Sequence, residues 1–227
     1  MTILCIETST AVCSAAICRD GELLKQCICM EGSNHARLLP AYIDELLDYA
    51  RHNAIEIEGV ALSEGPGSYT GLRIGTSTAK GLCYGMDIPL YPVSTLEVLC
   101  EAARRSLASN NEAVSQPSFI PMIDARRMEV YTTDGGGKAR AVVVENEESL
   151  SGDNEADFYY FGDGAAKCQK VFTRPNWHYL PSIVPQAQYM GALVERMTER
   201  PSVDIAYYEP YYLKEFIAAQ SHVKGLK

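Results

Sequence analysis

Hydrophobic and polar positions in the first third of the chain follow two different periods. Apolar and β-branched residues dominate residues 2–8, 11–18 and 22–30, and the pair Asp20-Gly21 separates the second run from the third. Such runs joined by short turns predict three strands in consecutive hairpins. Over residues 38–50 the apolar positions recur every three or four residues instead, which predicts an amphipathic helix with Pro40 in its first turn.

Strand and helix patterns then alternate around a glycine-rich turn. Residues 59–63 predict a strand, residues 64–71 form the turn, and residues 72–84 predict a helix. A strand over residues 89–93 and a helix over residues 95–105 are expected next. The polar segment 106–117 is the best candidate for a linker between two parts of the chain.

The second half of the chain repeats this alternation less clearly. We expect strands over residues 119–123, 129–133, 139–144 and 158–161, helices near residues 165–172 and 186–200, and an extended tail over residues 207–213. A hairpin group followed by alternating strands and helices favours an α/β fold with mixed sheets flanked by helices. The linker predicts an N-terminal lobe of residues 1–106 and a C-terminal lobe of residues 107–227, whose tail can pack back on the first lobe.

Composition limits the class of protein. The chain has 227 residues, of which 47% are hydrophobic and 22% charged, as in globular proteins, and no apolar run reaches the roughly 18 residues that a membrane span requires. The N-terminus has neither a basic start nor a long apolar core, so it does not resemble a secretory signal. We therefore expect a cytoplasmic protein that does not bind membranes.

The charge and the cysteines narrow the chemistry further. The net charge is −9 and neither half of the chain is basic, so a role on RNA would be indirect, through a basic partner. The eight cysteines include no C-x-x-C pair, which favours reduced, structural thiols over a zinc site or a disulfide framework.

Two turns carry candidate chemistry. The turn at Glu7, Thr8 and Ser9 brings together a carboxylate and hydroxyls that can hold a phosphate or, through water, a magnesium ion; a polar hairpin tip is the alternative. The glycine-rich turn around Gly65 and Gly67 allows the backbone to approach another group closely, next to a helix N-terminus. It matches neither the dinucleotide-binding pattern nor a P-loop nor a serine-hydrolase elbow.

Small residues recur every four positions in the helix that follows this turn. Gly71, Gly75 and Ala79 would let another helix approach closely, and two glycines inside a helix suggest that a contact offsets their cost. That contact is either internal packing on the chain's own sheet or a subunit interface. The residue pattern leaves both open.

Metal chemistry has little support in the sequence. The four histidines are scattered, and the position four residues after His35, where a helical ligand pair would place a second histidine, is Leu39. We expect no metal site in this chain.

Several segments together resemble one known family. They are Ile-Glu-Thr-Ser at residues 6–9, Glu-Gly-Pro-Gly-Ser-Tyr-Thr-Gly-Leu-Arg-Ile-Gly at residues 64–75, Ile-Asp-Ala-Arg-Arg-Met-Glu-Val-Tyr at residues 123–131, Gly-Asp-Gly at residues 162–164 and Pro-Tyr-Tyr-Leu-Lys at residues 210–214. In this order they resemble the TsaB family of bacterial tRNA threonylcarbamoyladenosine biosynthesis proteins, once called glycoprotease-like. The position of Glu7 often holds Asp in that family, and residues 216–227 match no pattern of it.

The resemblance implies a fold and a role. The fold would have two lobes, as in actin, sugar kinases and heat-shock ATPases. The chain would be a non-catalytic paralogue of TsaD, which holds its catalytic metal through a His-x-x-x-His pair. It would act as a scaffold for TsaD and the ATPase TsaE, so that the threonylcarbamoyl group reaches the adenosine next to the tRNA anticodon.

The resemblance also implies where the partners bind. The chain would form a homodimer or pair with TsaD through the two helices of its first lobe, with the expected contact residues Leu38, Tyr42, Leu46, Gly71, Leu72, Gly75, Thr78, Ala79 and Leu82. The chain alone would bind no cofactor, although ATP or ADP with magnesium could act in the assembled complex. Candidate nucleotide contacts are Glu7, Thr8, Ser9, Gly65 and Gly67.

Two enzymatic alternatives remain. A small-molecule kinase or ATPase of the same fold would use Glu7 with magnesium and would need a second-lobe carboxylate, for which Asp124 and Asp163 are the candidates. A peptidase acting on its paralogue is a weaker alternative, since the chain has neither a zinc-ligand pair nor a serine elbow.

Overall fold

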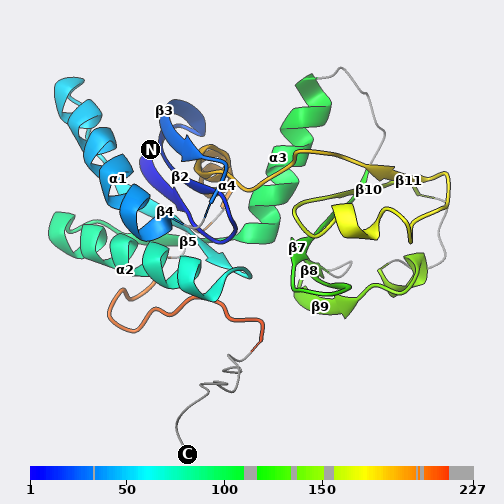
Figure 1. Cartoon of the computed structure of the whole chain (residues 1–227). Coiled ribbons are helices and arrows are strands. Elements are labelled where there is room, and N and C mark those ends of the chain that lie inside the picture. The colour runs from blue at the N-terminus through cyan, green and yellow to red at the C-terminus, as the bar shows by residue number, and fades with distance from the viewer. Residues whose placement is uncertain are drawn as a thin grey trace, which may run out of the picture.

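The chain forms two lobes on either side of one helix, as a computed structural model shows (Figure 1). The structure describes residues 1–32, 34–109, 117–133, 137–150, 156–197, 199 and 202–214. Within them, no helix is both long enough and apolar enough to cross a membrane.

A five-stranded mixed sheet forms the first lobe. Its strands are β1 (Thr2–Glu7), β2 (Cys13–Arg19), β3 (Glu22–Cys29), β4 (Gly59–Gly65) and β5 (Leu90–Ser94), in the order β3-β2-β1-β4-β5. The first three strands pair antiparallel through two hairpins, while β4 and β5 run parallel to β1. The predicted hairpin group followed by parallel strands is therefore confirmed for this lobe.

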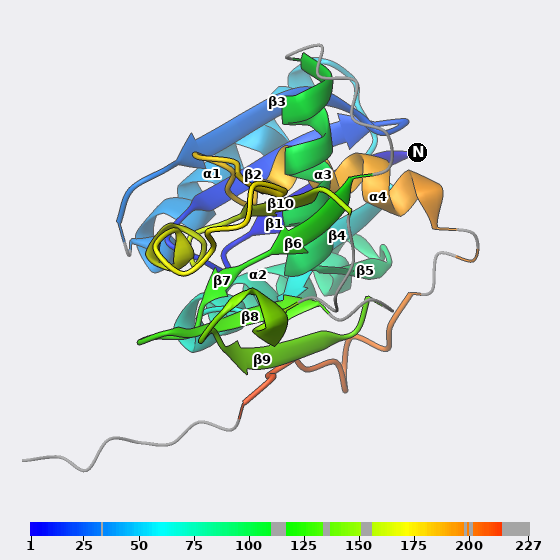
Figure 2. The same ribbon diagram turned by 90° about the vertical axis from the view of Figure 1, so that its right-hand side faces the viewer.

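Helices cover both faces of this sheet. The helices α1 (His35–His52) and α2 (Tyr69–Met86) pack on one face, where Leu39, Ile43 and Leu46 join a core with strand residues such as Leu4 and Leu62. The other face is covered by α3 (Thr95–Ser109), by the 3₁₀ turn η3 (Ala187–Tyr189) and by α4 (Met190–Arg196). Figure 2 shows α3 and α4 on the side of the sheet opposite α1 and α2.

The second lobe contains two small sheets. The strands β6 (Ser118–Pro121), β10 (Phe158–Phe161) and β11 (Trp177–Tyr179) form a parallel sheet in the order β11-β10-β6. The strands β7 (Ile123–Asp124), β8 (Glu129–Thr133) and β9 (Ala139–Val143) form an antiparallel sheet. The 3₁₀ turns η1 (Glu147–Ser149) and η2 (Ala166–Cys168) complete the lobe, whose aromatic core includes Phe158, Phe172 and Trp177.

Helix α3 joins the two lobes. Its Val98 belongs to the core of the first lobe, whereas Leu96, Leu99 and the neighbouring alanines pack with Phe161 of the second lobe. A buried carboxylate on the same helix, Glu101, accepts hydrogen bonds from arginines on α3 and α4. One helix thus carries apolar contacts to both lobes and an ionic contact to α4.

The predicted lobe boundary is wrong for the C-terminal part of the chain. Helix α4 packs on β1, β2, β4 and β5, and Met190 and Val194 belong to the core of the first lobe. The chain therefore leaves the first lobe after α3 and returns to it from η3 onward. The prediction allowed the tail to pack back on the first lobe, but it assigned residues 186–200, which include α4, to the second lobe.

Three predicted elements also differ from the observed ones. The strand expected over residues 119–123 is divided at Met122, so that β6 and β7 join different sheets. The helix expected over residues 165–172 reduces to the turn η2, and that over residues 186–200 becomes η3 followed by α4. Much of the predicted linker, residues 110–116, lies outside the described residues, whereas residues 106–109 extend α3.

The tail of the described chain runs along α2 and reaches the second lobe. Lys80 of α2 donates hydrogen bonds to the backbone carbonyls of Ala206 and Tyr208, and the Tyr211 N–H donates to the Glu64 carbonyl at 2.8 Å. The ring of Tyr212 stacks on Tyr69 with centroids 4.0 Å apart. Beyond the stack, the Lys214 ammonium forms an ion pair with Glu129 of β8.

The stack predicts that two tyrosines of the tail contribute unequally to the free energy of unfolding. Tyr212→Ala removes the stack on Tyr69 and the hydrogen bond from Arg73 to the tyrosine hydroxyl, so we expect the free energy of unfolding to fall by about 1–2 kcal/mol. Tyr207 is 85% exposed, and Tyr207→Ala should change it by less than about 0.5 kcal/mol. Urea unfolding measures the free energy of unfolding of both variants. Equal losses of stability would contradict the role of the stack in holding the tail on α2.

Candidate functional site

The two candidate turns meet at the carboxyl ends of parallel strands. Glu7 ends β1, and the register of β1 with β4 pairs Ile6 with Leu62, so the glycine-rich turn after β4 lies next to the turn after β1. This edge is where α/β sheets usually bind ligands. The structure therefore brings together the two turns from which the candidate nucleotide contacts were drawn.

The Glu7 carboxylate is completely buried at this edge. Its Oε1 accepts hydrogen bonds from the Ser9 N–H at 2.7 Å and the Ser9 hydroxyl at 2.5 Å. Its Oε2 has no hydrogen-bond partner in the described part of the chain. Loss of hydration raises the pKa of Glu7 from 4.5 to about 7, although the hydrogen bonds from Ser9 act in the opposite direction.

The glycines of the second turn are needed for contacts within the chain. The Ser68 N–H donates to the Ser9 carbonyl at 2.6 Å, and a Cβ on Gly67 would lie 2.3 Å from the same oxygen. Gly65 has a φ of +119°, and a Cβ there would lie 2.5 Å from the Tyr211 carbonyl oxygen. Only a residue without a side chain fits at either position.

This packing argues against the predicted nucleotide contacts. Glu7, Thr8 and Ser9 each have 0% exposure, so none of these side chains can meet a ligand from solvent. The backbone at Gly65 and Gly67 faces the tail and the β1–β2 turn rather than an open cradle. The five residues come together in space as expected, but the space between them is filled by the chain itself.

Helix α2 starts against the same turn. Ser68 caps the helix by accepting a hydrogen bond from the Gly71 N–H, and the Thr8 hydroxyl donates to the Gly71 carbonyl at 2.8 Å. A Cβ on Gly71 would lie 2.0 Å from the Thr8 carbonyl oxygen, and one on Gly75 would lie 2.4 Å from the Thr8 hydroxyl oxygen. The four-residue glycine spacing therefore lets the helix approach the end of β1.

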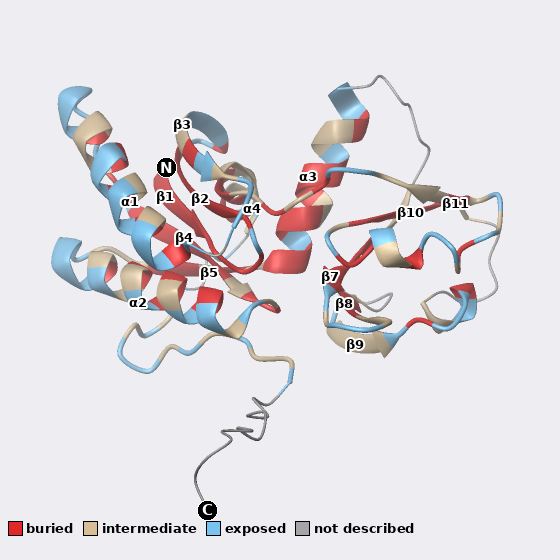
Figure 3. Ribbon diagram, viewed as in Figure 1, coloured by how far each residue is buried: buried red, intermediate tan, exposed pale blue. Residues whose placement is uncertain are grey.

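The predicted partner contacts divide into two groups. One group is buried in the chain's own core and faces the sheet, so in this structure it offers no surface to a partner: Leu46, Gly71, Leu72, Gly75 and Ala79. The other group is half-exposed: Leu38 and Tyr42 on α1, and Thr78 and Leu82 on α2. Figure 3 shows buried residues on one side of each of these helices and exposed residues on the other.

The outer side of α2 carries small residues that the sequence analysis overlooked. Ser77, Gly81 and Gly85 are exposed, and an added Cβ at either glycine would meet no atom within 4 Å. Ile74 and Tyr84 flank them, and Tyr84 is 83% exposed. Because 3.6 residues make one turn, these positions lie on the side of the helix opposite Leu72 and Ala79. The helical period of α2 was the signal in the sequence that could have identified these outward residues.

The residues considered for metal or catalytic roles make structural contacts within the chain. The His35 Nε2 lies 2.9 Å from the Thr10 carbonyl oxygen, and Leu39 is in the core. The Asp163 Oδ1 accepts the Asp124 N–H at 2.9 Å, while the Asp124 carboxylate pairs with Lys167. Among the described residues, no group of three or more His, Cys, Asp and Glu side chains is placed to hold a metal ion.

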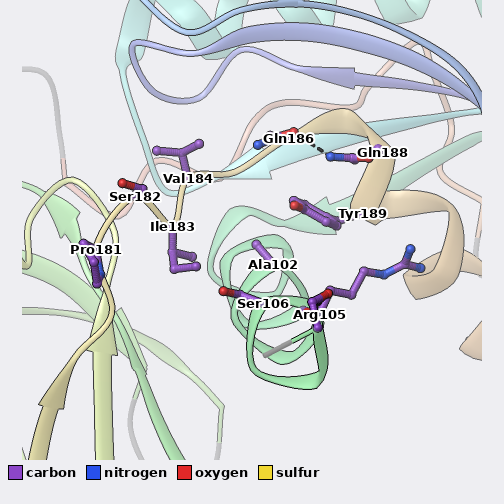
Figure 4. A pocket seen from close by; sticks show the side chains of 11 residues that line it. Ala102, Arg105, Ser106, Pro181, Ser182, Ile183, Val184, Gln186, Gln188 and Tyr189 are labelled. Atoms are coloured by element: carbon purple, nitrogen blue, oxygen red, sulfur yellow. Dashed lines mark hydrogen bonds between the residues drawn. The ribbon is translucent and has the colours of Figure 1, made fainter. Parts of the chain in front are cut away.

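A separate hollow lies between α3 and the segment that returns from the second lobe. It has a volume of about 440 Å³ and is lined by Ala102 and Arg105 of α3 and by residues 181–184, 186, 188 and 189 (Figure 4). The Gln188 amide donates to the Gln186 side-chain oxygen across part of its wall at 2.6 Å. No carboxylate, histidine or cysteine is among its described lining residues, so it offers no general acid, base or nucleophile of those types.

The inward and outward glycines of α2 predict opposite effects of one methyl group. Gly71→Ala should lower the free energy of unfolding by about 3 kcal/mol, because the Cβ overlaps the Thr8 carbonyl. Gly81→Ala should raise it by about 0.5–1 kcal/mol, because alanine favours the helix and the space is open. Urea unfolding of both variants tests this, and changes of the same sign would contradict the assigned orientation of α2.

The buried carboxylate predicts a pH-dependent stability. The folded chain keeps the Glu7 proton up to a pKa of about 7, whereas the unfolded chain releases it near 4.5. Its contribution is therefore full below pH 4.5 and is lost as the pH rises through 7, on the order of 3 kcal/mol. Compared with Glu7→Gln, the wild type should lose stability between pH 5 and 8. If the free energy of unfolding depended on pH in the same way in the two proteins, the assigned pKa would be refuted.

Comparisons with known proteins agree with this architecture. The family model described as "TsaD: tRNA N6-adenosine threonylcarbamoyltransferase" matches residues 31–218. The tRNA threonylcarbamoyladenosine biosynthesis protein TsaB of Haemophilus influenzae is 28% identical over 94% of both chains. TsaB of Bacillus subtilis is 36% identical over 58% of this chain and 54% of its own.

A solved structure shows the same fold. YeaZ from Pseudomonas aeruginosa superposes with a TM-score of 0.73 and 27% identity, covering 93% of this chain and 99% of that one. The predicted two-lobed α/β fold is confirmed by the described structure and agrees with this similarity. The chain belongs to the TsaD family and, within it, to the TsaB/YeaZ group of tRNA threonylcarbamoyladenosine biosynthesis proteins.

Proposed function

We propose that this chain is a non-catalytic subunit in the threonylcarbamoylation of the adenosine next to the tRNA anticodon. It pairs with itself when alone and with TsaD when TsaD is present, and the complex recruits the ATPase TsaE. The observation that carries this proposal is the outer side of α2, where Gly81 and Gly85 stand in open space. We call the surface of Ile74, Ser77, Gly81, Tyr84 and Gly85 the outer face of α2.

The outer face of α2 has no explanation within the described chain. A glycine inside a helix costs about 0.5–1 kcal/mol relative to alanine. At Gly71 and Gly75 the close approach of Thr8 offsets this cost, but no atom lies near the Cβ position of Gly81 or Gly85. A partner helix would provide the missing contact, because small residues let two helix axes come close.

Half-exposed apolar residues also occur on α1 and on the inner flank of α2. Leu38 and Tyr42 of α1 and Leu82 of α2 pack against the core while remaining half-exposed. Leu82 lies on the flank of α2 opposite Lys80, and it is at Lys80 that the tail covers the helix. Apolar area with few charges is typical of the centre of a protein interface.

The geometry of the turns favours a supporting role over the kinase alternative. Glu7 is sealed from solvent, and the second-lobe candidates Asp124 and Asp163 hold turn backbone. A buried carboxylate that is neutral up to a pKa of about 7 is a poor partner for magnesium and phosphate. We therefore expect ATP or ADP with magnesium to act elsewhere in the assembled complex. The net charge of −9 likewise favours indirect contact with tRNA.

A larger side chain in place of Gly81 tests whether the outer face of α2 is the partner surface. Gly81→Leu should weaken self-association and the affinity for TsaD at least about tenfold, because the side chain would keep the two helices apart. The fold of the monomer should be retained, since that side chain projects into open space. Light scattering and calorimetric titration with TsaD give the two readouts.

Two controls separate this effect from a general one. Ala108→Leu places the same side chain on an exposed position of α3 and should leave both affinities unchanged. Circular dichroism confirms that each variant is folded. Unchanged association in a folded Gly81→Leu variant would refute the outer face of α2 as the partner surface.

The role itself is tested by reconstitution. Purified TsaD, TsaE and this chain are combined with ATP, the threonylcarbamoyl donor and unmodified tRNA, and the modified nucleoside is quantified by mass spectrometry with each protein omitted in turn. We expect no product without this chain and none with this chain as the sole protein. Full activity without it, or turnover by it alone, would overturn the proposal.

A further inference from the structure

Two cysteines face each other across the outer hairpin of the first sheet. Cys13 begins β2 and Cys29 ends β3, and the antiparallel register pairs them directly. Directly paired residues point to the same face of a sheet, with Cα atoms about 4.5–5.5 Å apart. This separation falls within the roughly 4.4–6.8 Å that a disulfide spans.

The two thiols differ in their access to solvent. Cys13 is fully buried, whereas Cys29 is partly exposed and lies on β3, an edge strand of the sheet. The Cys29 Sγ lies 2.9 Å from the Glu31 carbonyl oxygen, next to the end of the strand. Burial, and then the nearby Cys29, raises the pKa of the Cys13 thiol to about 11. A reagent from solvent would therefore reach Cys29 first.

The other thiols of this lobe lack one of these two properties. Cys27 shares the face and the strand of Cys29, but it is paired with Ala15 instead of a thiol. Cys5 and Cys18 lie on the opposite face beneath α4, where the Cβ position of Gly191 is 2.9 Å from the Cys18 sulfur. The pair of Cys13 and Cys29 combines a facing thiol with access from solvent.

We propose that Cys13 and Cys29 form a reversible modification site that reacts with a small disulfide such as glutathione disulfide. The Cys29 thiolate attacks one sulfur of the reagent, breaks its S–S bond and releases one glutathione thiolate, which takes up the proton that Cys29 lost. The Cys13 thiolate then attacks the Cys29 sulfur and releases the second glutathione with the Cys13 proton. Two protein thiols are oxidised to one disulfide, and one glutathione disulfide is reduced to two thiols.

The test follows the masses of the folded protein after incubation with glutathione disulfide and alkylation of the remaining thiols. Wild type should lose two hydrogens, retain no glutathione and show two fewer alkylated thiols than the eight in the sequence. Trypsin leaves Cys13 and Cys29 in peptides that each contain other cysteines, so variants must assign the bond.

The variants give distinct outcomes. Cys29→Ser should form no cross-link, whereas Cys13→Ala should stop at one glutathione bound to Cys29. Cys27→Ala is the matched control on the same strand and face, and Cys100→Ala removes the other partly exposed thiol; both should cross-link like the wild type. Circular dichroism verifies the fold of each. A cross-link that persists in Cys29→Ser or disappears in Cys27→Ala, or a wild type that remains glutathionylated, would overturn the proposal.

Discussion

The close approach of α2 to the end of β1 determines the arrangement of the first lobe. Gly67 and Gly71 bring the turn and the helix into contact with the backbone of Ser9 and Thr8, at distances that no side chain would permit. This contact fills the edge of the sheet where related architectures bind ligands, and it seals the Glu7 carboxylate from water. It also fixes the rotation of α2 about its axis, so that the opposite side of the helix faces outward. The filled edge of the sheet and the exposure of the outer face of α2 are therefore consequences of the same packing.

Much of the fold could be read from the sequence where local signals and packing agree. The three opening strands, α1, α2 and the glycine turn were all predicted, because hairpin residues and helical periods are local properties. The second lobe was predicted less well. Met122 divides one apolar run between two sheets, and the segment after Ala165 has a helical period but continues as turns. The return of α4 to the first lobe is a long-range contact, which no local pattern encodes.

The candidate site shows the same limit within a single helix. The sequence correctly indicated that the glycines of α2 serve a close contact, but it could not say with what. Gly71 and Gly75 contact Thr8 of the same chain, whereas Gly81 and Gly85 lie free on the outer side. Both sets are spaced by four residues, so spacing alone could not distinguish them; the packing direction could. Placing Leu72 and Ala79 in the core from the helical period would have separated the two sets.

The tail ties the two lobes together at a site remote from α3. Tyr211 and Tyr212 are held on the first lobe, and two residues later Lys214 pairs with Glu129 of the second lobe. Many two-lobed enzymes close one lobe over the other around a hinge when substrate binds. Here such a rotation would have to extend the short backbone segment from Tyr212 to Lys214, which is held at both ends. These contacts would hold the two lobes in one relative position, which agrees with the proposed non-catalytic role.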